Sequence, residues 1–319
     1  MTIRQLDRVC AAVVAVAAGV TLAGCGGNDN TGGKTVSGPV VIDGSSTVEP
    51  LSSAAAALFM GEYPDTDVTV GTSGTGGGFA KFCAGETDVS DASRPIEGDE
   101  VAACEAKGIA FSQLTVANDA LSVVVNPDND WADCLTTEQL NTIWAPGSTV
   151  TNWNQVDPSF PNEPLQLFGA GTDSGTFDYF TQVVNGQEGA SRTDYAATED
   201  DNVTVEGVAA SKGGLGYFGY SYVEANPDKV KAVKIDGGGG CVAPSSESAR
   251  DGSYTPLTRE LFIYVSDAAL TKPQVASFAD FYLRSNTKIV EEAGFIPLTD
   301  DQLKAALSEL DELNAKVTN

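Results

Sequence analysis

The 319-residue chain contains no histidine, and its basic residues are few, since 18 lysines and arginines stand against 44 aspartates and glutamates. Without histidine it cannot build a Ser-His-Asp or Cys-His catalytic system, a histidine-ligated zinc site or a histidine phosphorelay. Its net charge of −26 would repel nucleic acids and anionic lipids at long range. The composition therefore argues against most familiar hydrolase mechanisms and against a nucleic-acid partner.

The residues that are present indicate a globular α/β protein. Hydrophobic residues make up 42% of the chain, and the length predicts two domains at about 150 residues each. Strand-like runs alternate with helical patterns. The predicted strands are residues 40–42, 68–70, 109–111, 121–125, 165–168 and 261–265. No linker separates two consecutive halves, so we expect interleaved domains.

Three capping boxes, each a threonine followed three residues later by glutamine, predict helix starts. They lie at Thr136, Thr271 and Thr299. After the last of them, apolar residues recur at helical spacing over residues 303–317, which predicts a terminal helix with one face in the core.

The N-terminus is typical of a bacterial lipoprotein signal. Arg4 and Arg8 precede an apolar run over residues 9–22 that ends in Leu-Ala-Gly-Cys25. We expect residues 1–24 to be a signal peptide, Cys25 to carry lipid, and residues 25–37, rich in Gly, Asn and Thr, to form a flexible tether. An uncleaved anchor is the alternative, although the apolar run is shorter than the roughly 20 residues that span a membrane.

Four cysteines remain after Cys10 is removed with the signal peptide and Cys25 is lipidated: Cys83, Cys104, Cys134 and Cys241. An even number in an oxidising compartment predicts two disulfides, with three pairings open. Free or metal-binding thiols are the weaker alternative, because no Cys-x-x-Cys spacing occurs.

Three segments place small hydroxyl-bearing residues between a predicted strand and a predicted helix. They read VIDGSSTVEP (41–50), VGTSGTGGGFAKF (70–82) and LFGAGTDSGTFDYF (167–180). The unpaired N–H groups and the positive dipole end at a helix N-terminus attract anions. One such loop is ordinary capping, but three favour an anion site. A fourth segment, DVSDASRPI (88–96), supplies Arg94, which either grips two oxyanion oxygens or forms a surface ion pair.

The motifs GSST, SGTGGGF, ASRPI and GTDSGTFDYF resemble those of the phosphate-binding lipoprotein of the bacterial high-affinity phosphate ABC transporter, Pst-type, in the periplasmic-binding-protein superfamily. DALSVVVN, LTTEQLNTIW and LGYFGY extend the resemblance over most of the chain. It implies an α/β, type II-like periplasmic-binding-protein fold, with two lobes, a hinge and a ligand cleft between them. Lobe 1 would comprise residues 38–118 plus 256–319, and lobe 2 residues 119–255.

The resemblance also implies a function. The protein would be a non-enzymatic, lipid-anchored extracytoplasmic receptor, monomeric and without cofactor or metal. It would capture inorganic phosphate and deliver it to the membrane permease and ATPase subunits of an ABC transporter. The implied phosphate ligands are Ser46, Thr47, Val48, Ser73, Thr75, Ser93, Arg94, Asp173, Ser174, Gly175 and Thr176. We expect them to line a single dry pocket sized for one tetrahedral ion.

The chain departs from the family pattern in its charges. Many members have Ser-Asp where Ser93 and Arg94 stand here, and an arginine where Ala170 stands. The resemblance suggests that Arg94 replaces that missing cation. The carboxylate that accepts the proton of hydrogen phosphate would then be Asp173, Asp91 or Glu49, of which we favour Asp173.

The implied lobes also select a disulfide pairing. Cys83–Cys104 and Cys134–Cys241 each stay within one lobe, whereas the other pairings would tie the lobes together and oppose closure of a hinge.

Other functions stay open at this stage. The ligand could be sulfate or molybdate instead of phosphate. A serine-dependent phosphatase is a second alternative, although neither Ser73 nor Ser174 completes Gly-x-Ser-x-Gly or Ser-x-x-Lys. A surface-structural lipoprotein without a small ligand is the third.

Overall fold

The computed structural model describes residues 36–172, 174–198 and 200–318. The expected signal peptide, the lipidation residue Cys25 and nearly all of the expected tether lie outside the described residues, as does Asp173. None of the helices among the described residues has both the length and the apolar character needed to cross a bilayer.

The strands form a large mixed sheet and a small one. The large sheet has the order β2-β1-β3-β12-β4-β8-β6-β7, with β9 paired to β4, and the small one has the order β11-β10-β5. The strands are β1 (Gly38–Gly44), β2 (Thr66–Gly71), β3 (Val89–Ala92), β4 (Phe111–Val125), β5 (Cys134–Thr136), β6 (Gln166–Ala170), β7 (Ala196–Thr198), β8 (Gly214–Gly219), β9 (Lys231–Ala232), β10 (Lys234–Asp236), β11 (Cys241–Val242) and β12 (Thr258–Ser266).

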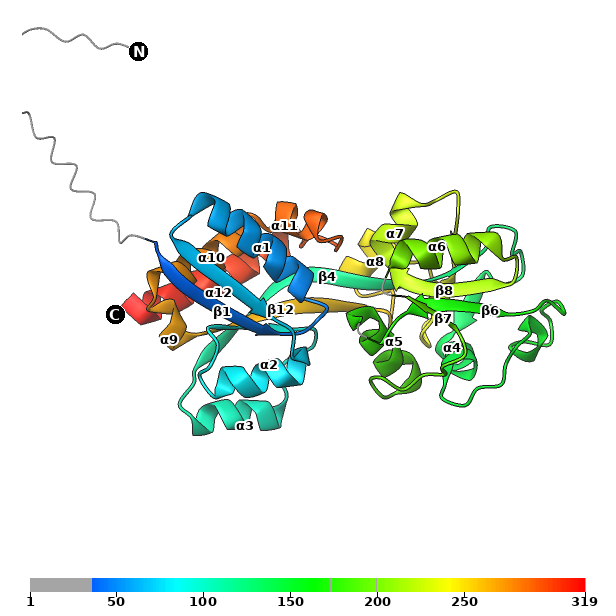
Figure 1. Ribbon diagram of the computed structural model, residues 1–319, viewed down its shortest axis with the longest axis horizontal. Helices are drawn as coiled ribbons and strands as arrows, with labels where there is room; N and C mark the ends of the chain where they lie inside the picture. The colour runs from blue at the N-terminus through cyan, green and yellow to red at the C-terminus, as the bar shows by residue number, and fades with distance from the viewer. Residues whose placement is uncertain (1–35, 173, 199, 319) are drawn as a thin grey trace, which may run out of the picture. The chain divides into compact units, whose positions relative to one another are not determined.

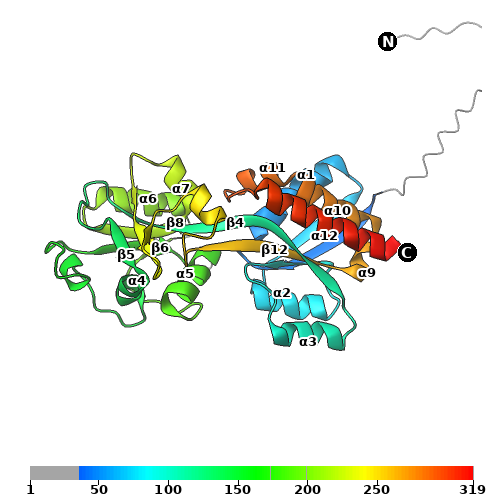
Figure 2. The same cartoon turned by 180° about the vertical axis from the view of Figure 1, so that it is seen from behind.

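Helices pack on both faces of the large sheet. They are α1 (Glu49–Glu62), α2 (Gly74–Cys83), α3 (Gly98–Ala106), α4 (Thr137–Trp144), α5 (Gly175–Asn185), α6 (Asp201–Ala210), α7 (Tyr220–Ala225), α8 (Ser246–Arg250), α9 (Asp267–Leu270), α10 (Pro273–Arg284), α11 (Asn286–Glu292) and α12 (Asp300–Thr318), with a 3₁₀ turn at Trp153–Gln155. Near β1, α1, α10 and α12 cover one face and α2 and α3 the other (Figures 1 and 2). The alternation confirms the predicted α/β class.

Two large core clusters divide the described residues into two lobes. The first joins β1, β2 and the start of β4 to α1 and to the C-terminal helices. The second is rich in aromatic rings, among them Phe180 stacked on Tyr217 with their centroids 3.8 Å apart. Along β4, Ala117 belongs to the first cluster and Ala120 to the second. The lobe boundaries at 118/119 and 255/256 stay a prediction.

Two long antiparallel strands run from one lobe to the other. β4 pairs with β12 over residues 111–120 and with β8 over 121–125. The prediction of separate strands at 109–111 and 121–125 was wrong in part, because a single strand of 15 residues begins at Phe111 and includes all of 121–125. Asn118 and Asp119 interrupt the apolar pattern, yet both are buried and bonded, to Gln302 and Arg259 respectively.

The helix signals were largely confirmed. Both hydrogen bonds of the capping box form at Thr136 and at Thr299, where α4 and α12 begin. The predicted start at Thr271 was wrong: its hydroxyl donates to the Ala268 carbonyl, and α10 begins at Pro273 with Lys272 as its N-cap.

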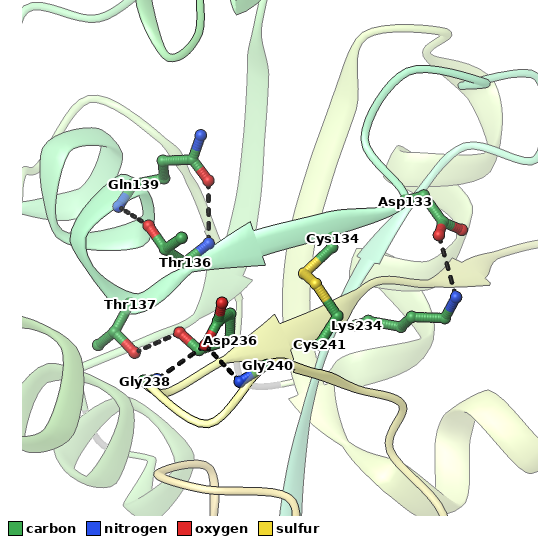
Figure 3. The surroundings of a disulfide bond; sticks show 10 residues. All are labelled: Asp133, Cys134, Thr136, Thr137, Gln139, Lys234, Asp236, Gly238, Gly240 and Cys241. Carbon is green, nitrogen blue, oxygen red and sulfur yellow. Dashed lines mark hydrogen bonds and ion pairs between the residues drawn. A yellow bond between two sulfur atoms is a disulfide. The ribbon is translucent and has the colours of Figure 1, made fainter.

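Both predicted disulfides are confirmed. Cys83–Cys104, with an S–S distance of 1.97 Å, joins α2 to α3. Cys134–Cys241, with an S–S distance of 2.02 Å, fastens β5 to β11 in the small sheet (Figure 3). Beside it, the Asp236 carboxylate accepts hydrogen bonds from the backbone N–H groups of Gly238 and Gly240. Each bond therefore stiffens one lobe.

Candidate functional site

The first of the three loops forms a closed turn between β1 and α1. The Ser45 N–H donates to the Asp91 carbonyl at 2.9 Å, and the Thr47 N–H donates to the Ser45 hydroxyl at 3.2 Å. The Val48 N–H donates to the Ser45 carbonyl at 3.2 Å, and the Val48 side chain is buried. The N–H of Val48 is therefore used for a hydrogen bond within the turn, whereas Ser46 and Thr47 line cavities.

The second loop turns its capping serine away from those cavities. The hydroxyl and N–H of Ser73 both donate to Asp43, which also holds Lys81 at 2.6 Å. Ser73 is exposed, and the lining of the two cavities described below does not include it. Thr75, the second residue of α2, lines one of those cavities instead, and its Oγ1 lies 3.1 Å from the Ser93 hydroxyl.

The third loop touches the first. Ser174 caps α5, because its hydroxyl accepts a hydrogen bond from the Thr176 N–H at 3.2 Å. A Cβ on Gly175 would lie 2.7 Å from the Thr47 nitrogen and closer still to its Oγ1. The N-terminus of α5 in lobe 2 is therefore seated directly on the loop that opens α1 in lobe 1.

Two adjoining cavities flank this contact, and Ser46 and Thr47 line both. The one that we call the α7 cavity is lined by Ser46, Thr47, Asp119, Ser174, Gly175, Thr176, Ser221, Tyr222 and neighbouring residues. The one that we call the α2 cavity is lined by Ser45, Ser46, Thr47, Gly74, Thr75, Ser93, Arg94, Asp178, Tyr179, Arg259 and others.

The cavities are larger than expected. Their volumes are about 460 and 480 Å³, whereas a water molecule occupies about 30 Å³ in the liquid. The expected ligands do not share a single cavity, because these two cavities divide them and Val48 and Ser73 line neither. The structure brings Ser46, Thr47, Ser174, Gly175 and Thr176 together in the first cavity, and Thr75, Ser93 and Arg94 with the first loop in the second.

Arg94 lines the α2 cavity, but its guanidinium is already paired with carboxylates of its own lobe. Nη1 and Nη2 each donate to one oxygen of Glu100 at 2.8 Å, and Glu97 lies 3.5 Å from Nε. The side chain is 37% exposed. Two carboxylates thus offset the charge that we expected it to bring to an anion.

A second arginine, Arg259, lies between the two cavities, and sequence reasoning missed it. Its Nη2 donates to the Thr47 hydroxyl at 2.9 Å, and its Nε lies 3.1 Å from Asp119 on β4. The guanidinium carbon sits 3.7 Å from the centre of the Tyr179 ring. A basic residue two positions before the buried apolar run 261–265 of the same strand was the signal that could have revealed it.

Two of the three carboxylates proposed to accept a phosphate proton, Asp91 and Glu49, are described, and both lie away from the two cavities. Asp91 is completely buried behind the first loop and accepts a hydrogen bond from the Ser52 hydroxyl at 2.8 Å. Burial raises its pKa to about 8, assisted by the nearby carboxylates of Glu49 and Asp43. Glu49 accepts a hydrogen bond from the Ser53 hydroxyl. Neither residue lines either cavity.

Other carboxylates do line the cavities. Asp178 faces the α2 cavity, and burial, with Glu188 adding repulsion, raises its pKa to about 6. Asp119 faces the α7 cavity. Burial raises its pKa, while the charge and hydrogen bond of Arg259 oppose that shift.

This arrangement suits binding of a small anion. Three helix N-termini, of α1, α2 and α5, face the cavities with hydroxyl groups and two arginines among them. Backbone donors, the positive dipole ends and guanidinium groups all favour negative charge.

The comparisons with known proteins agree with this chemistry. The family model of the PBP superfamily domain matches residues 29–286. Protein SphX of Synechocystis is 46% identical over 82% of this chain and 79% of its own length. The phosphate-binding protein PstS of Staphylococcus saprophyticus is 38% identical over 95% of this chain and 93% of its own.

A solved structure is similar as well. The "possible phosphate binding protein" of Planctomyces limnophilus is 49% identical, with a TM-score of 0.83 over 87% of this chain and 99% of its own. The predicted two-lobed fold and the family resemblance are both confirmed. The chain therefore belongs to the PBP superfamily and, within it, to the family of PstS and SphX.

Proposed function

We propose that this protein is a receptor that binds inorganic phosphate between its two lobes. The observation that carries the proposal is the contact of Gly175 with Thr47, which brings the N-terminus of α5 onto the loop that opens α1. An anion at this point would meet positive dipole ends and hydroxyl donors from both lobes. The name of the relative PstS and the description of the Planctomyces structure support phosphate as that anion.

The proposed ligands come from both lobes. Ser46 and Thr47 offer hydroxyl donors from lobe 1, and Ser174, Gly175 and Thr176 offer the capped end of α5 from lobe 2. Thr75, Ser93 and Arg94 complete the set from the α2 cavity. Val48 and Ser73 would shape their loops, and Asp173 stays a prediction as the proton acceptor.

The same proposal extends to the setting in which the receptor works. It would be exported by the signal peptide (1–24), anchored by lipid on Cys25, tethered by residues 25–37 and monomeric. It would pass phosphate to the permease and ATPase subunits of an ABC transporter. It would be a carrier and not an enzyme, without cofactor or metal, and its lobes would be residues 38–118 plus 256–319, and 119–255.

Calorimetric titration of the full-length protein in detergent tests the binding function. We expect one phosphate per chain with micromolar or tighter affinity, because several charge-assisted hydrogen bonds supply the roughly 8 kcal/mol required. Sulfate, titrated side by side, is expected to bind far more weakly, since it lacks the proton that a carboxylate in the site would accept. Tight sulfate binding would reassign the ligand, and the absence of saturable binding to both anions would contradict a receptor function.

A further inference from the structure

The two strands that connect the lobes carry an ion pair that is largely withdrawn from solvent. Arg259 on β12 stands opposite Asp119 on β4 in the register of the sheet, with Nε 3.1 Å from Oδ2. Their side chains are 13% and 7% exposed. Taking two charges out of water is costly, and burying them is favourable only where geometry and further hydrogen bonds compensate. The position is therefore unusual for a pair that served packing alone.

The guanidinium of Arg259 contacts residues of both lobes. On one side its Nη2 donates to the Thr47 hydroxyl of the first loop at 2.9 Å. On the other side it stacks on the ring of Tyr179, a residue of α5 whose hydroxyl donates to the Pro256 carbonyl at 2.8 Å. Arg259 thus touches the two elements whose N-terminal ends meet at Thr47 and Gly175.

Arg259 also lies in the wall between the two cavities. It lines the α2 cavity, Asp119 lines the α7 cavity, and Thr47 lines both. The guanidinium is therefore close to the hydroxyl and backbone donors proposed to hold phosphate.

The two arginines of the site differ in how fully their guanidinium groups are already paired with carboxylates. Arg94 forms a two-pronged bond with Glu100 and lies near Glu97. Arg259 has one carboxylate partner among the described residues, through Nε alone, and its hydrogen bonds to described residues leave Nη1 unused. A guanidinium has five N–H donors and can bind two oxyanion oxygens at once.

We infer that Arg259 supplies the principal positive charge to the bound anion and that Asp119 holds its guanidinium in position. The inference rests on the proposed phosphate-binding function. It identifies a residue that could take the place of the arginine that many family members have where Ala170 stands here. Arg259 and Asp119 both lie on the strands that connect the lobes, so the negative charge of a bound anion would interact directly with the hinge. The pair would then link the occupancy of the site to the angle between the lobes.

The decisive comparison is phosphate titration of full-length protein carrying Arg259→Gln, Arg94→Gln or Arg284→Gln. Arg284 pairs with Asp280 on the exposed side of α10, which makes it a matched control for loss of one arginine charge. We expect Arg259→Gln to weaken binding about 10- to 100-fold, the factor that charge-assisted hydrogen bonds supply. Arg94→Gln should cost only a few-fold, and Arg284→Gln should leave the affinity at the wild-type value. An affinity loss that is larger for Arg94→Gln than for Arg259→Gln would overturn the inference.

A direct readout on the wild-type protein covers the case in which Arg259→Gln does not fold. In ¹⁵N spectra of arginine side chains, the resonance missing from Arg259→Lys identifies Arg259, and we expect it to shift when phosphate saturates the protein. If wild-type protein binds phosphate while that resonance stays in place, the inference alone fails. If wild-type protein binds no phosphate at all, both the proposed function and the inference are contradicted.

Asp119→Asn separates positioning from general stability. We expect it to weaken phosphate binding less than Arg259→Gln, and we expect little further loss in the double variant, because the two residues act as a unit. Fully additive losses would show that Asp119 does not act through Arg259.

Discussion

At the scale of single residues, a carboxyl group buried behind the first loop makes stability depend on pH. Asp91 is fully buried, and its pKa is raised to about 8, chiefly by desolvation. In the unfolded chain the same group ionises near pH 3.9. Between these values the folded chain holds one proton more than the unfolded chain, so this group's contribution to stability falls as pH rises from about 4 to about 8.

Asp91→Asn should remove that dependence. The free energy of unfolding of the wild type, relative to the variant, is expected to fall by about 1.4 kcal/mol per pH unit between pH 5 and 7.5. Urea denaturation of both proteins at several pH values measures the difference. Parallel pH profiles would show that Asp91 ionises normally in the folded protein.

The residues that sequence reasoning found and missed differ in how local their evidence is. Ser174 and Gly175 could be predicted because helix capping depends on a few consecutive residues. Arg259 and Asp119 could not be, because their partnership joins positions 140 residues apart across two strands. For Arg94 the sequence left open an ion pair with a carboxylate, but nothing in its local sequence identified Glu100 as the partner.

At the scale of elements, the two disulfides close loops of very different length. Cys83 and Cys104 are 21 residues apart, and Cys134 and Cys241 are 107 apart. Since a cross-link restricts the unfolded chain more when its loop is longer, we expect the double serine variant of the second pair to lose more stability. The expected losses are about 3 kcal/mol for the first pair and about 4 to 5 kcal/mol for the second.

Urea unfolding of the two double variants under non-reducing conditions measures those losses. Phosphate affinity serves as the control, and we expect it to be retained because neither bond lies at the cavities. Equal losses, or a larger loss for the shorter loop, would contradict the prediction.

Elements with strong local signals were easier to predict than those built by distant contacts. The helices after the three loops, and the capping boxes at Thr136 and Thr299, follow from patterns within a single turn. β4 was predicted as two strands because Asn118 and Asp119 look like a break until their partners on α12 and β12 are known.

At the scale of the whole molecule, one glycine sets how closely the lobes approach. Gly175 begins α5, and a Cβ there would lie 2.7 Å from the Thr47 nitrogen and 2.9 Å from its Cα. Backbone atoms cannot yield as a flexible side chain can. Gly175→Ala should therefore hold the lobes apart and weaken phosphate binding roughly 10-fold or more, as misplacement of a ligand set does.

The matched control is Gly98→Ala. Gly98 likewise begins a helix, α3, but a Cβ there would meet nothing within 4 Å. Calorimetry gives the affinities, and X-ray scattering at saturating phosphate is expected to show a larger radius of gyration only for Gly175→Ala. Wild-type affinity and size in that variant would place the closure contact elsewhere.

The two-lobed architecture was predicted through family resemblance and not through local pattern. Nothing in the periodicity of residues 258–266 indicates that this strand lies between β3 and β4. The sheet order depends on pairings between segments far apart in the sequence, which propensities do not record.

That sheet order also bears on how the chain acquires its structure after synthesis. β3 pairs with β1 and β12 alone among the described strands, and α10 and α12 supply much of the first core. A polypeptide emerging N-terminus first must leave β3 without β12, its neighbour on one side, until roughly the last 60 residues arrive. Most of the strands and helices of the second lobe come from one continuous stretch and can assemble sooner. We therefore expect lobe 1, whose first strands are synthesised before any of lobe 2, to complete its fold after lobe 2.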